Sequence, residues 1–266
     1  MSWVRNNVSK QSAEKRLLNL QSLQKSQQQQ PAPSQALPPR SISGTLLIEE
    51  PSDIIEYTNR SCLDFIDAIL YINLDHRLDR NSHILSEINK ICNDKTKIHR
   101  ISAIKRDNGA LGCGLSHIKA LEFIKTHPNW NTILILEDDF TFKSNNLNEI
   151  NHKIVKLLEN NNMDMGLLSH NNLLCSDTDE KLIKKVFYSI TTSSYIIKSE
   201  YVDTLLNNMR ESMSDMEKNG KKHDNCLDIY WTKLQPISNW YAIYPAIGYQ
   251  YDNYSDIEKK HCAYNC

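Results

Sequence analysis

Three adjacent carboxylates, Glu137, Asp138 and Asp139, follow directly after the aliphatic run of residues 133–136. Such a run predicts a strand buried on both faces of a parallel sheet. Ligands of open α/β sheets bind at the carboxyl ends of strands, and carboxylates there suit a divalent cation that holds a diphosphate. An acidic trio is also typical of a helix N-terminus or a solvated turn. Because alternate side chains of an extended segment share a face, we expect Glu137 and Asp139 to face the site and Asp138 to point away.

Two arginines, Arg77 and Arg80, follow a second predicted buried strand at residues 65–73. If the two strands are parallel, the arginines lie at the same sheet edge as the acidic trio. Guanidinium groups bind diphosphates through forked hydrogen bonds, so both arginines are candidates for that role. The alternative is local salt bridges with Asp75 and Asp79 at the start of a helix.

A glycine-punctuated segment, NGALGCG at residues 108–114, is predicted to be a loop that opens a helix. Backbone N–H groups in such a loop suit a phosphate or a sugar, although the segment is neither a P-loop nor a full dinucleotide fingerprint. Ser116 and His117 then fall in the first turn of the helix. The alternatives are a helix cap for Ser116 and a packed core histidine for His117.

Two late acidic residues, Asp224 and Asp228, lie four positions apart and are expected to share one face of a helix. Bulky apolar residues follow Asp228, among them Tyr230 and Trp231. Because partial desolvation raises the pKa of a carboxyl group, Asp228 is a candidate general base. The alternative, a helix N-terminal acid, fits Asp224 better. The other histidines show neither an H-E-x-x-H pattern nor Cys/His ligand spacing, which argues against a zinc site.

The elements that position these residues alternate between strands and helices. Further strands are predicted at residues 97–103, 163–168 and 194–197, and a last apolar segment runs from 240 to 245. Helices are predicted around residues 84–91, 147–158, 199–218 and 225–235, and a polar loop separates the strands at 163–168 and 194–197. This alternation predicts an α/β fold with a doubly wound, mostly parallel sheet and helices on both faces.

The 266 residues divide into a tail and one domain. Residues 1–60 are predicted to be a mostly disordered tail, because their Gln/Pro-rich linker at 26–43 has almost nothing to bury. Residues 61–266 form the expected catalytic domain. The net charge of −1 gives no case for a nucleic-acid partner. No apolar run is long enough for a membrane span, and neither a signal peptide nor a C-x-x-C pair is evident, so we expect a cytoplasmic protein with reduced thiols.

These motifs together resemble glycosyltransferase family 25, which includes bacterial lipooligosaccharide and collagen galactosyltransferases. The resemblance rests on YINLDHRLDR at residues 71–80, GCGLSH at 112–117 and LEDD at 136–139. The later segments LDIYWTKLQ at 227–235 and YSDIE at 254–258, together with Gln250, are similar to the branch of the family found in large DNA viruses. The resemblance covers about residues 65–260.

The resemblance implies a GT-A-like fold and an enzyme of glycan or lipopolysaccharide biosynthesis. Such an enzyme transfers galactose or glucose from a UDP-sugar to a hydroxyl of a glycan, glycolipid or protein, with inversion. It implies a divalent metal, Mn²⁺ or Mg²⁺, and, for a viral protein, a location in the host cytoplasm or the virion.

Site residues follow from the resemblance position by position. It places the metal on Asp139 and Glu137 and makes Asp228 the base or a second metal contact. It assigns donor binding to Arg77, Arg80, Gly112, Ser116, His117, Glu137 and Asp138. The chain departs from the family pattern at Gly114 and at residues 251–253, where no charged group is lost.

Two other functions remain open from the sequence. One is nucleotidyl transfer, which releases diphosphate; the absence of a Gly-rich, Lys/Arg-containing loop after the first strand argues against it. The other is a non-catalytic sugar- or nucleotide-binding descendant, acting as a structural or particle-associated protein. The intact acidic trio and Asp228 argue against that second function.

Overall fold

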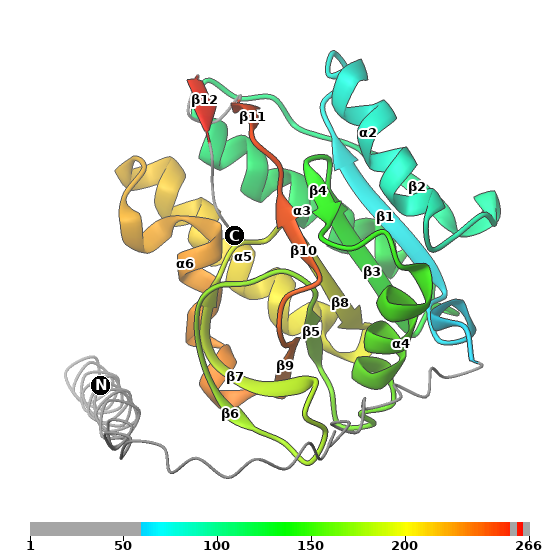
Figure 1. The fold of residues 1–266 in the computed structure, drawn as a ribbon. Coiled ribbons are helices and arrows are strands. Elements are labelled where there is room, and N and C mark those ends of the chain that lie inside the picture. The colour runs from blue at the N-terminus through cyan, green and yellow to red at the C-terminus, as the bar shows by residue number, and fades with distance from the viewer. Residues whose placement is uncertain (1–59, 256–259, 263–266) are drawn as a thin grey trace, which may run out of the picture. The chain divides into compact units, whose positions relative to one another are not determined.

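The computed structural model describes residues 60–255 and 260–262 (Figure 1). The predicted tail with its Gln/Pro-rich linker lies outside the described residues, as do residues 256–258 of the last motif. Within the described residues, no helix is both long and apolar enough to cross a membrane.

The core of the fold is an eight-stranded sheet with the strand order β2-β1-β3-β8-β5-β9-β7-β6. Its strands are β1 (Ala68–Asn73), β2 (Ile98–Ser102), β3 (Thr132–Glu137), β5 (Met165–Leu167), β6 (Asn171–Asp177), β7 (Ile183–Ile190), β8 (Ser194–Lys198) and β9 (Trp240–Ile243). The pairs β1–β2, β1–β3 and β5–β9 are parallel, and the others are antiparallel. The predicted α/β fold is confirmed, with a sheet that is parallel around β1 and mixed beyond β3.

Helices cover both faces of this sheet (Figure 1). They are α2 (Leu78–Asn89), α3 (Gly109–Lys125), α4 (Leu147–Leu158), α5 (Val202–Asn219) and the short α6 (Leu227–Tyr230). In β3, Ile133 and Ile135 pack towards α3 and α5, while Leu134 and Leu136 pack towards α2 and α4. Each of these four side chains is fully buried. Burial of each stabilises the fold by about 1.5–3 kcal/mol, which explains the continuous aliphatic run.

Helix α3 begins earlier than predicted, so the expected glycine loop is wrong. The Asn108 side chain caps the helix by accepting a hydrogen bond from the Leu111 N–H at 3.3 Å. Close packing explains two of the glycines: a Cβ on Gly112 would lie 2.6 Å from the Ile104 carbonyl oxygen, and one on Gly114 would collide with Met213 of α5. Ser116 and His117 therefore lie in the middle of a helix and not in its first turn.

The predicted single helix at residues 225–235 is also wrong. Cys226 has an extended backbone (φ −67°, ψ 141°), which separates the 3-10 turn His223–Asn225 from α6. Asp224 is exposed on that turn, while Asp228 is part of α6, so the two do not share one helical face. Further 3-10 turns follow at Trp231–Lys233 and Gln235–Ile237.

The polar loop predicted before β8 is instead the antiparallel hairpin of β6 and β7. Its pairing contains register shifts, and the buried positions of β7 recur at every third residue: Ile183, Val186 and Ser189. A strand normally alternates between buried and exposed positions, so this three-residue spacing in the sequence does not predict a strand. Two small sheets complete the fold, β4 (Phe140–Phe142) with β10 (Gly248–Gln250) and β11 (Asn253–Ser255) with β12 (Lys260–Cys262).

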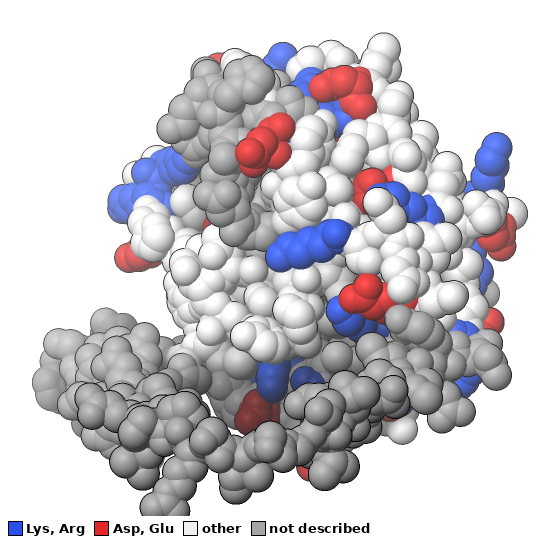
Figure 2. Space-filling view, in the orientation of Figure 1, with Lys and Arg blue, Asp and Glu red and all other residues white. Residues whose placement is uncertain are grey.

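The carboxyl ends of β1 and β3 lie side by side, with Ile72 paired opposite Glu137. The chain leaves β1 for β2 on one side and returns to β3 on the other, so this edge is a topological switch point. Ligands of α/β sheets bind at such points. On the face of the molecule visible in Figure 2, basic and acidic side chains are interspersed, in keeping with the net charge of −1.

Candidate active site

A cavity of about 320 Å³ opens at this switch point. The volume is at the lower end of the range for small-molecule sites, about 300–1,000 Å³. The predicted site residues in its lining are Arg80, Gly112, Ser116, His117, Glu137, Asp138 and Asp139. Arg77 and Asp228 are not among the lining residues. Most of the predicted set is therefore gathered around one space, although the roles of individual residues differ from expectation.

All three carboxylates of the trio line the cavity, so the prediction that Asp138 points away is wrong. The reason is that β3 ends at Glu137, and Asp138 and Asp139 form a turn into β4. Alternation between faces applies only to extended backbone. As a result, Glu137 contacts α3 while the two aspartates contact α2.

Arg80 from α2 pairs with both aspartates. Its Nη1 lies 2.8 Å from Asp138 Oδ1 and 3.1 Å from Asp139 Oδ2, and the side chains of these three residues are 11%, 10% and 6% exposed. Its Nη2 donates to the carbonyl oxygen of Tyr254. The Nε is buried and has no partner among the described residues. Arg80 thus neutralises the aspartates in this structure, whereas we predicted that it would be available to a diphosphate.

Arg77 makes the local salt bridge that the sequence left as an alternative. Its Nη2 lies 2.8 Å from Asp79, and its Nη1 donates to the Tyr254 carbonyl oxygen at 3.1 Å. The hydrogen bonds from Arg77 hold the pKa of Asp79 down at about 2. Arg77 and Arg80 together anchor the C-terminal segment beside the cavity, so a donor contact for Arg77 remains only a prediction.

His117 is fully buried, and it holds Glu137 in place. Its Nε2 lies 3.2 Å from Glu137 Oε1, and its Nδ1 lies 3.0 Å from the hydroxyl of Tyr195. Thr192 also donates to Glu137 Oε1, at 2.6 Å. Burial raises the pKa of Glu137, but the interactions with His117, Thr192 and Arg80 together outweigh it, so the net pKa is below its usual value.

The pKa of Asp139 shifts in the opposite direction. Burial, followed by the charge of Glu137, raises its pKa to about 7, even though Arg80 opposes the change. Burial also raises the pKa of Asp138. A bound cation would stabilise both ionised carboxylates. Since the donor atoms are carboxylate oxygens facing a cavity, the residues fit a hard divalent ion such as Mg²⁺ or Mn²⁺.

Ser116 and Gly112 shape the cavity wall. The Ser116 hydroxyl donates to the Gly112 carbonyl oxygen at 2.6 Å and accepts from the Ile104 N–H at 2.8 Å. These bonds fix the loop of residues 103–107 against α3 at the close approach that Gly112 permits. The Ser116 hydroxyl and the Gly112 carbonyl are thus both engaged within the protein, which favours a positioning role for these residues over direct donor binding.

Two basic residues at the cavity mouth, Lys105 and Arg106, were missed by the sequence analysis. Both are exposed, line the cavity and make no ion pair with any described residue. A Lys-Arg pair directly after a predicted strand, at the same sheet edge as the acidic trio, was the available signal. Gln250 belongs to the segments that resemble the viral branch but was given no role at the site; its amide lies 3.4 Å from Asp139 Oδ1.

Asp228 stands at the start of α6, close enough to Glu137 for the two charges to interact. Burial and then the charge of Glu137 raise its pKa, while a hydrogen bond from the backbone N–H of Thr191 opposes them. Trp231, one of the bulky residues that follow Asp228, is fully buried and donates to the Ser189 carbonyl oxygen at 3.2 Å.

Residues 107–219 match the family model "Glycosyltransferase family 25 (LPS biosynthesis protein)". The predicted resemblance is confirmed over this segment, which includes α3, the acidic trio and α5 but neither Arg80 nor Asp228. It supports a glycosyltransferase with a sugar donor and an acceptor. No curated protein matches the sequence.

Two solved structures show a distant similarity. One is a glycosyltransferase involved in the glycosylation of the major capsid of PBCV-1, with 11% identity, a TM-score of 0.37 and coverage of 57% of this chain and 67% of that one. The other is A197 from STIV, with 14% identity, a TM-score of 0.39 and coverage of 74% and 93%. At such TM-scores the likeness adds nothing to the assignment, which rests on the family match and the site.

Proposed function

We propose that this chain, which matches glycosyltransferase family 25 over residues 107–219, transfers a hexose from a UDP-sugar to a hydroxyl group. The hexose is galactose or glucose, and the acceptor is a glycan, a glycolipid or a protein. One observation carries the proposal: a single cavity at the switch point of the sheet is lined by three carboxylates of the matched segment and by two basic residues that have no ion pair among the described residues.

The charges of the cavity suit the diphosphate of such a donor. Lys105 and Arg106 at the mouth are the cations best placed to bind its oxygens, because Arg80 is already paired with Asp138 and Asp139. Asp139, helped by Glu137, would hold a divalent metal ion. When bound there, Mn²⁺ or Mg²⁺ supplies neutralising charge for the departing diphosphate.

Asp228 is the proposed general base. Its carboxylate accepts the proton of the acceptor hydroxyl while the hydroxyl oxygen attacks the anomeric carbon. Attack on the face opposite the diphosphate inverts the configuration there. The raised pKa of Asp228 supports this role, because a base works best when its pKa approaches the working pH.

Exchange of Asp228 for asparagine tests the assignment. Asp228→Asn removes the base but keeps its shape, so turnover should fall by about 10²-fold or more while donor affinity stays nearly constant. Turnover is measured as UDP release and donor affinity by calorimetry. Asp224→Asn, at an exposed site four residues earlier, is the matched control and should behave as wild type. An equal loss of donor affinity in Asp228→Asn would make Asp228 a metal contact instead.

A non-catalytic descendant that binds a sugar or nucleotide is the second candidate. It is favoured by the pairing of Arg80 with both aspartates, because the guanidinium already neutralises groups that a metal ion would use. This candidate predicts UDP binding that is insensitive to Mn²⁺, with no release of UDP from any donor.

A further inference from the structure

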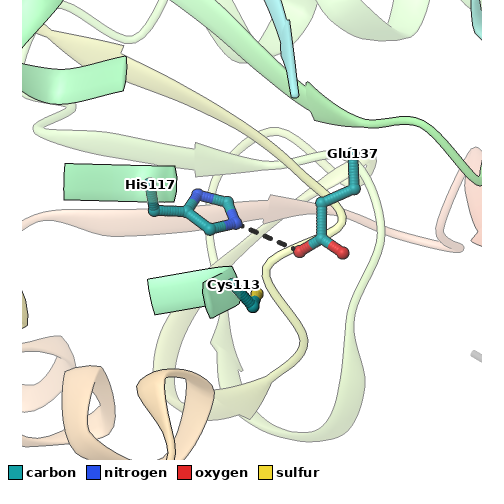
Figure 3. A group of neighbouring side chains, drawn as sticks. All are labelled: Cys113, His117 and Glu137. Atoms are coloured by element: carbon teal, nitrogen blue, oxygen red, sulfur yellow. Dashed lines mark hydrogen bonds and ion pairs between the residues drawn. The ribbon is translucent and has the colours of Figure 1, made fainter. Parts of the chain in front are cut away.

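Three side chains of different chemistry meet in the lining of the cavity: Cys113, His117 and Glu137 (Figure 3). Cys113 and His117 lie four residues apart on α3 and therefore on one face of that helix. Glu137 approaches from the end of β3. One ligand atom of each lies within 4.8 Å of the other two, and the His117 Nε2 to Glu137 Oε1 distance is 3.2 Å.

This combination of thiol, imidazole and carboxylate is a ligand set for Zn²⁺. Zinc binds Cys sulfur at about 2.3 Å and His nitrogen or carboxylate oxygen at about 2.0–2.2 Å, so ligand atoms in a tetrahedral site are about 3.5 Å apart. The His117–Glu137 pair already meets this spacing. Since the ligand atoms lie within 4.8 Å of one another, Cys113 Sγ must approach by about 1.3 Å at most to reach this spacing. A thiolate disfavours Mg²⁺ and Mn²⁺, so the set selects a softer ion.

The groups behind these ligands hold them in a suitable orientation. The Tyr195 hydroxyl contacts His117 Nδ1 and thereby directs Nε2 towards Glu137 and Cys113. Thr192 donates to the same oxygen that His117 contacts, Glu137 Oε1, and helps to fix the carboxylate. Metal-bound histidines are typically oriented by such a contact on their second nitrogen, and its loss weakens metal binding by about 10–100-fold.

The surroundings favour a cation and leave room for a further ligand. All three residues line the cavity, so three protein ligands would leave the fourth position of a tetrahedral ion facing the donor space. Burial, and then the charges of Glu137, Asp228 and the two aspartates of the trio, raise the pKa of the Cys113 thiol well above its usual value, and the same negative charges favour a bound cation. Three protein ligands with one open position is the arrangement of catalytic zinc sites, whereas structural sites are closed by four.

We propose that Cys113, His117 and Glu137 form a binding site for Zn²⁺ or a similar soft divalent ion. On binding, the Cys113 thiol loses its proton to solvent as the metal–sulfur bond forms, and the proton between His117 Nε2 and Glu137 Oε1 is likewise released to solvent as the metal–nitrogen bond forms. The site shares Glu137 with the hard-ion site. If the proposed transferase function holds, zinc therefore competes with Mn²⁺ and inhibits transfer.

Binding of Co²⁺, followed by absorption spectroscopy, tests the proposed site without depending on transferase activity. The full-length protein is reduced, stripped of metal with a chelator, and titrated with Co²⁺ while its absorption spectrum is recorded. A cobalt–thiolate bond produces a near-ultraviolet charge-transfer band, and four-coordinate cobalt produces strong visible bands. We expect both at one equivalent of Co²⁺, and both should disappear when Zn²⁺ is added.

Variants assign the bands to the proposed ligands. Cys113→Ser should abolish the charge-transfer band, and Cys175→Ser on β6, outside the cavity lining, should leave it unchanged. Asp139→Asn removes the hard-ion ligand and should also leave the band unchanged. Tyr195→Phe should weaken Zn²⁺ affinity by about 10-fold, measured by competition with a chromogenic chelator. Circular dichroism checks that each variant is folded.

The proposal is overturned if wild-type protein shows no charge-transfer band with Co²⁺, or if the band persists in folded Cys113→Ser. Loss of the band in Cys175→Ser would place the metal elsewhere and would also overturn it. None of these outcomes bears on the transferase function, which is tested by UDP release. Zinc binding without inhibition of transfer would keep the site and refute only its competition with Mn²⁺.

Discussion

On one wall of the cavity a permanent cation neutralises two aspartates, whereas on the other a histidine holds a single glutamate. We call the first the arginine wall (Arg80, Asp138, Asp139) and the second the histidine wall (Cys113, His117, Glu137). The arginine wall joins α2 to the turn after β3, and the histidine wall joins α3 to the end of β3. Both walls therefore depend on the same strand end.

The two walls differ in the chemical groups that they offer. Arg80 keeps its charge at any physiological pH, so the arginine wall has a fixed countercharge and only its carboxylates titrate. The histidine wall consists of a thiol, an imidazole and a carboxylate, each of which can bind a metal ion. The comparison implies that the arginine wall mainly stabilises the site, while the histidine wall is better suited to bind and release a metal ion.

The largest effect is expected from breaking the arginine wall. Arg80→Gln leaves two buried carboxylates without a countercharge, and removal of one partner from a buried ion pair costs about 3–5 kcal/mol of unfolding free energy. Urea denaturation measures the change. Arg210→Gln breaks an ion pair with Glu122 whose side chains are 52% and 49% exposed, so it should cost about 1 kcal/mol or less. Equal losses in both variants would contradict the structural role of Arg80.

A smaller loss is expected on the histidine wall. His117→Gln removes contacts to Tyr195 and Glu137 and leaves buried polar atoms without partners, at a cost of about 1–3 kcal/mol. Tyr195→Phe removes only one of these contacts and should cost less. The same denaturation experiment ranks the variants. A His117→Gln loss greater than that of Arg80→Gln would reverse the comparison between the walls.

Stability of the metal-free protein should depend on pH through Asp139. Its pKa is about 7 in the folded state and near 3.8 in the unfolded state, so the folded state binds the extra proton between these values. The stabilisation is complete below about pH 4 and is lost as the pH rises through about 7, with a slope of at most about 1.4 kcal/mol per pH unit. Denaturation in a chelator from pH 4.5 to 8 measures it. Asp139→Asn should reduce the loss of stability with rising pH. If the loss is unchanged in this variant, Asp139 is not its cause.

The smallest effect is expected at the cavity mouth. Lys105→Ala and Arg106→Ala each remove an exposed cation from the proposed diphosphate site, which should raise the donor KM about 5-fold with little change in kcat. Lys95→Ala, an exposed lysine outside the cavity lining, is the control and should leave KM unchanged. If neither variant raises KM, the diphosphate is bound elsewhere, and Arg77 and Arg80 return as candidates.

Much of the site could be predicted because its position depends on local patterns. The aliphatic runs before Asn73 and Glu137 define two buried parallel strands, and their carboxyl ends bring the acidic trio and Arg80 to one edge. The partners of these residues were not predictable in the same way. Arg80 pairs with Asp138 and Asp139, while Lys105 and Arg106 have no ion pair among the described residues, and this difference depends on how α2 and the loop after β2 pack. That packing is a tertiary property without a local sequence signal.

Two of the failed local predictions show most clearly why local patterns can mislead. Glycines in residues 108–114 were read as loop signals, but Gly112 and Gly114 serve close packing of α3 against a loop and against α5. As a result, the four-residue spacing of Cys113 and His117 was not recognised as one helical face. The β6–β7 hairpin was missed because register shifts break the alternation on which strand prediction depends.

Release of UDP by the purified full-length protein tests the central claim most directly. UDP-galactose, UDP-glucose and their N-acetyl forms are each incubated with and without Mn²⁺, and Asp139→Ala and Asp224→Ala are compared with wild type. We predict Mn²⁺-dependent release of UDP from one hexose donor, lost in Asp139→Ala and retained in Asp224→Ala. Absence of release from every donor, together with no UDP binding by calorimetry, would contradict the proposed transferase function.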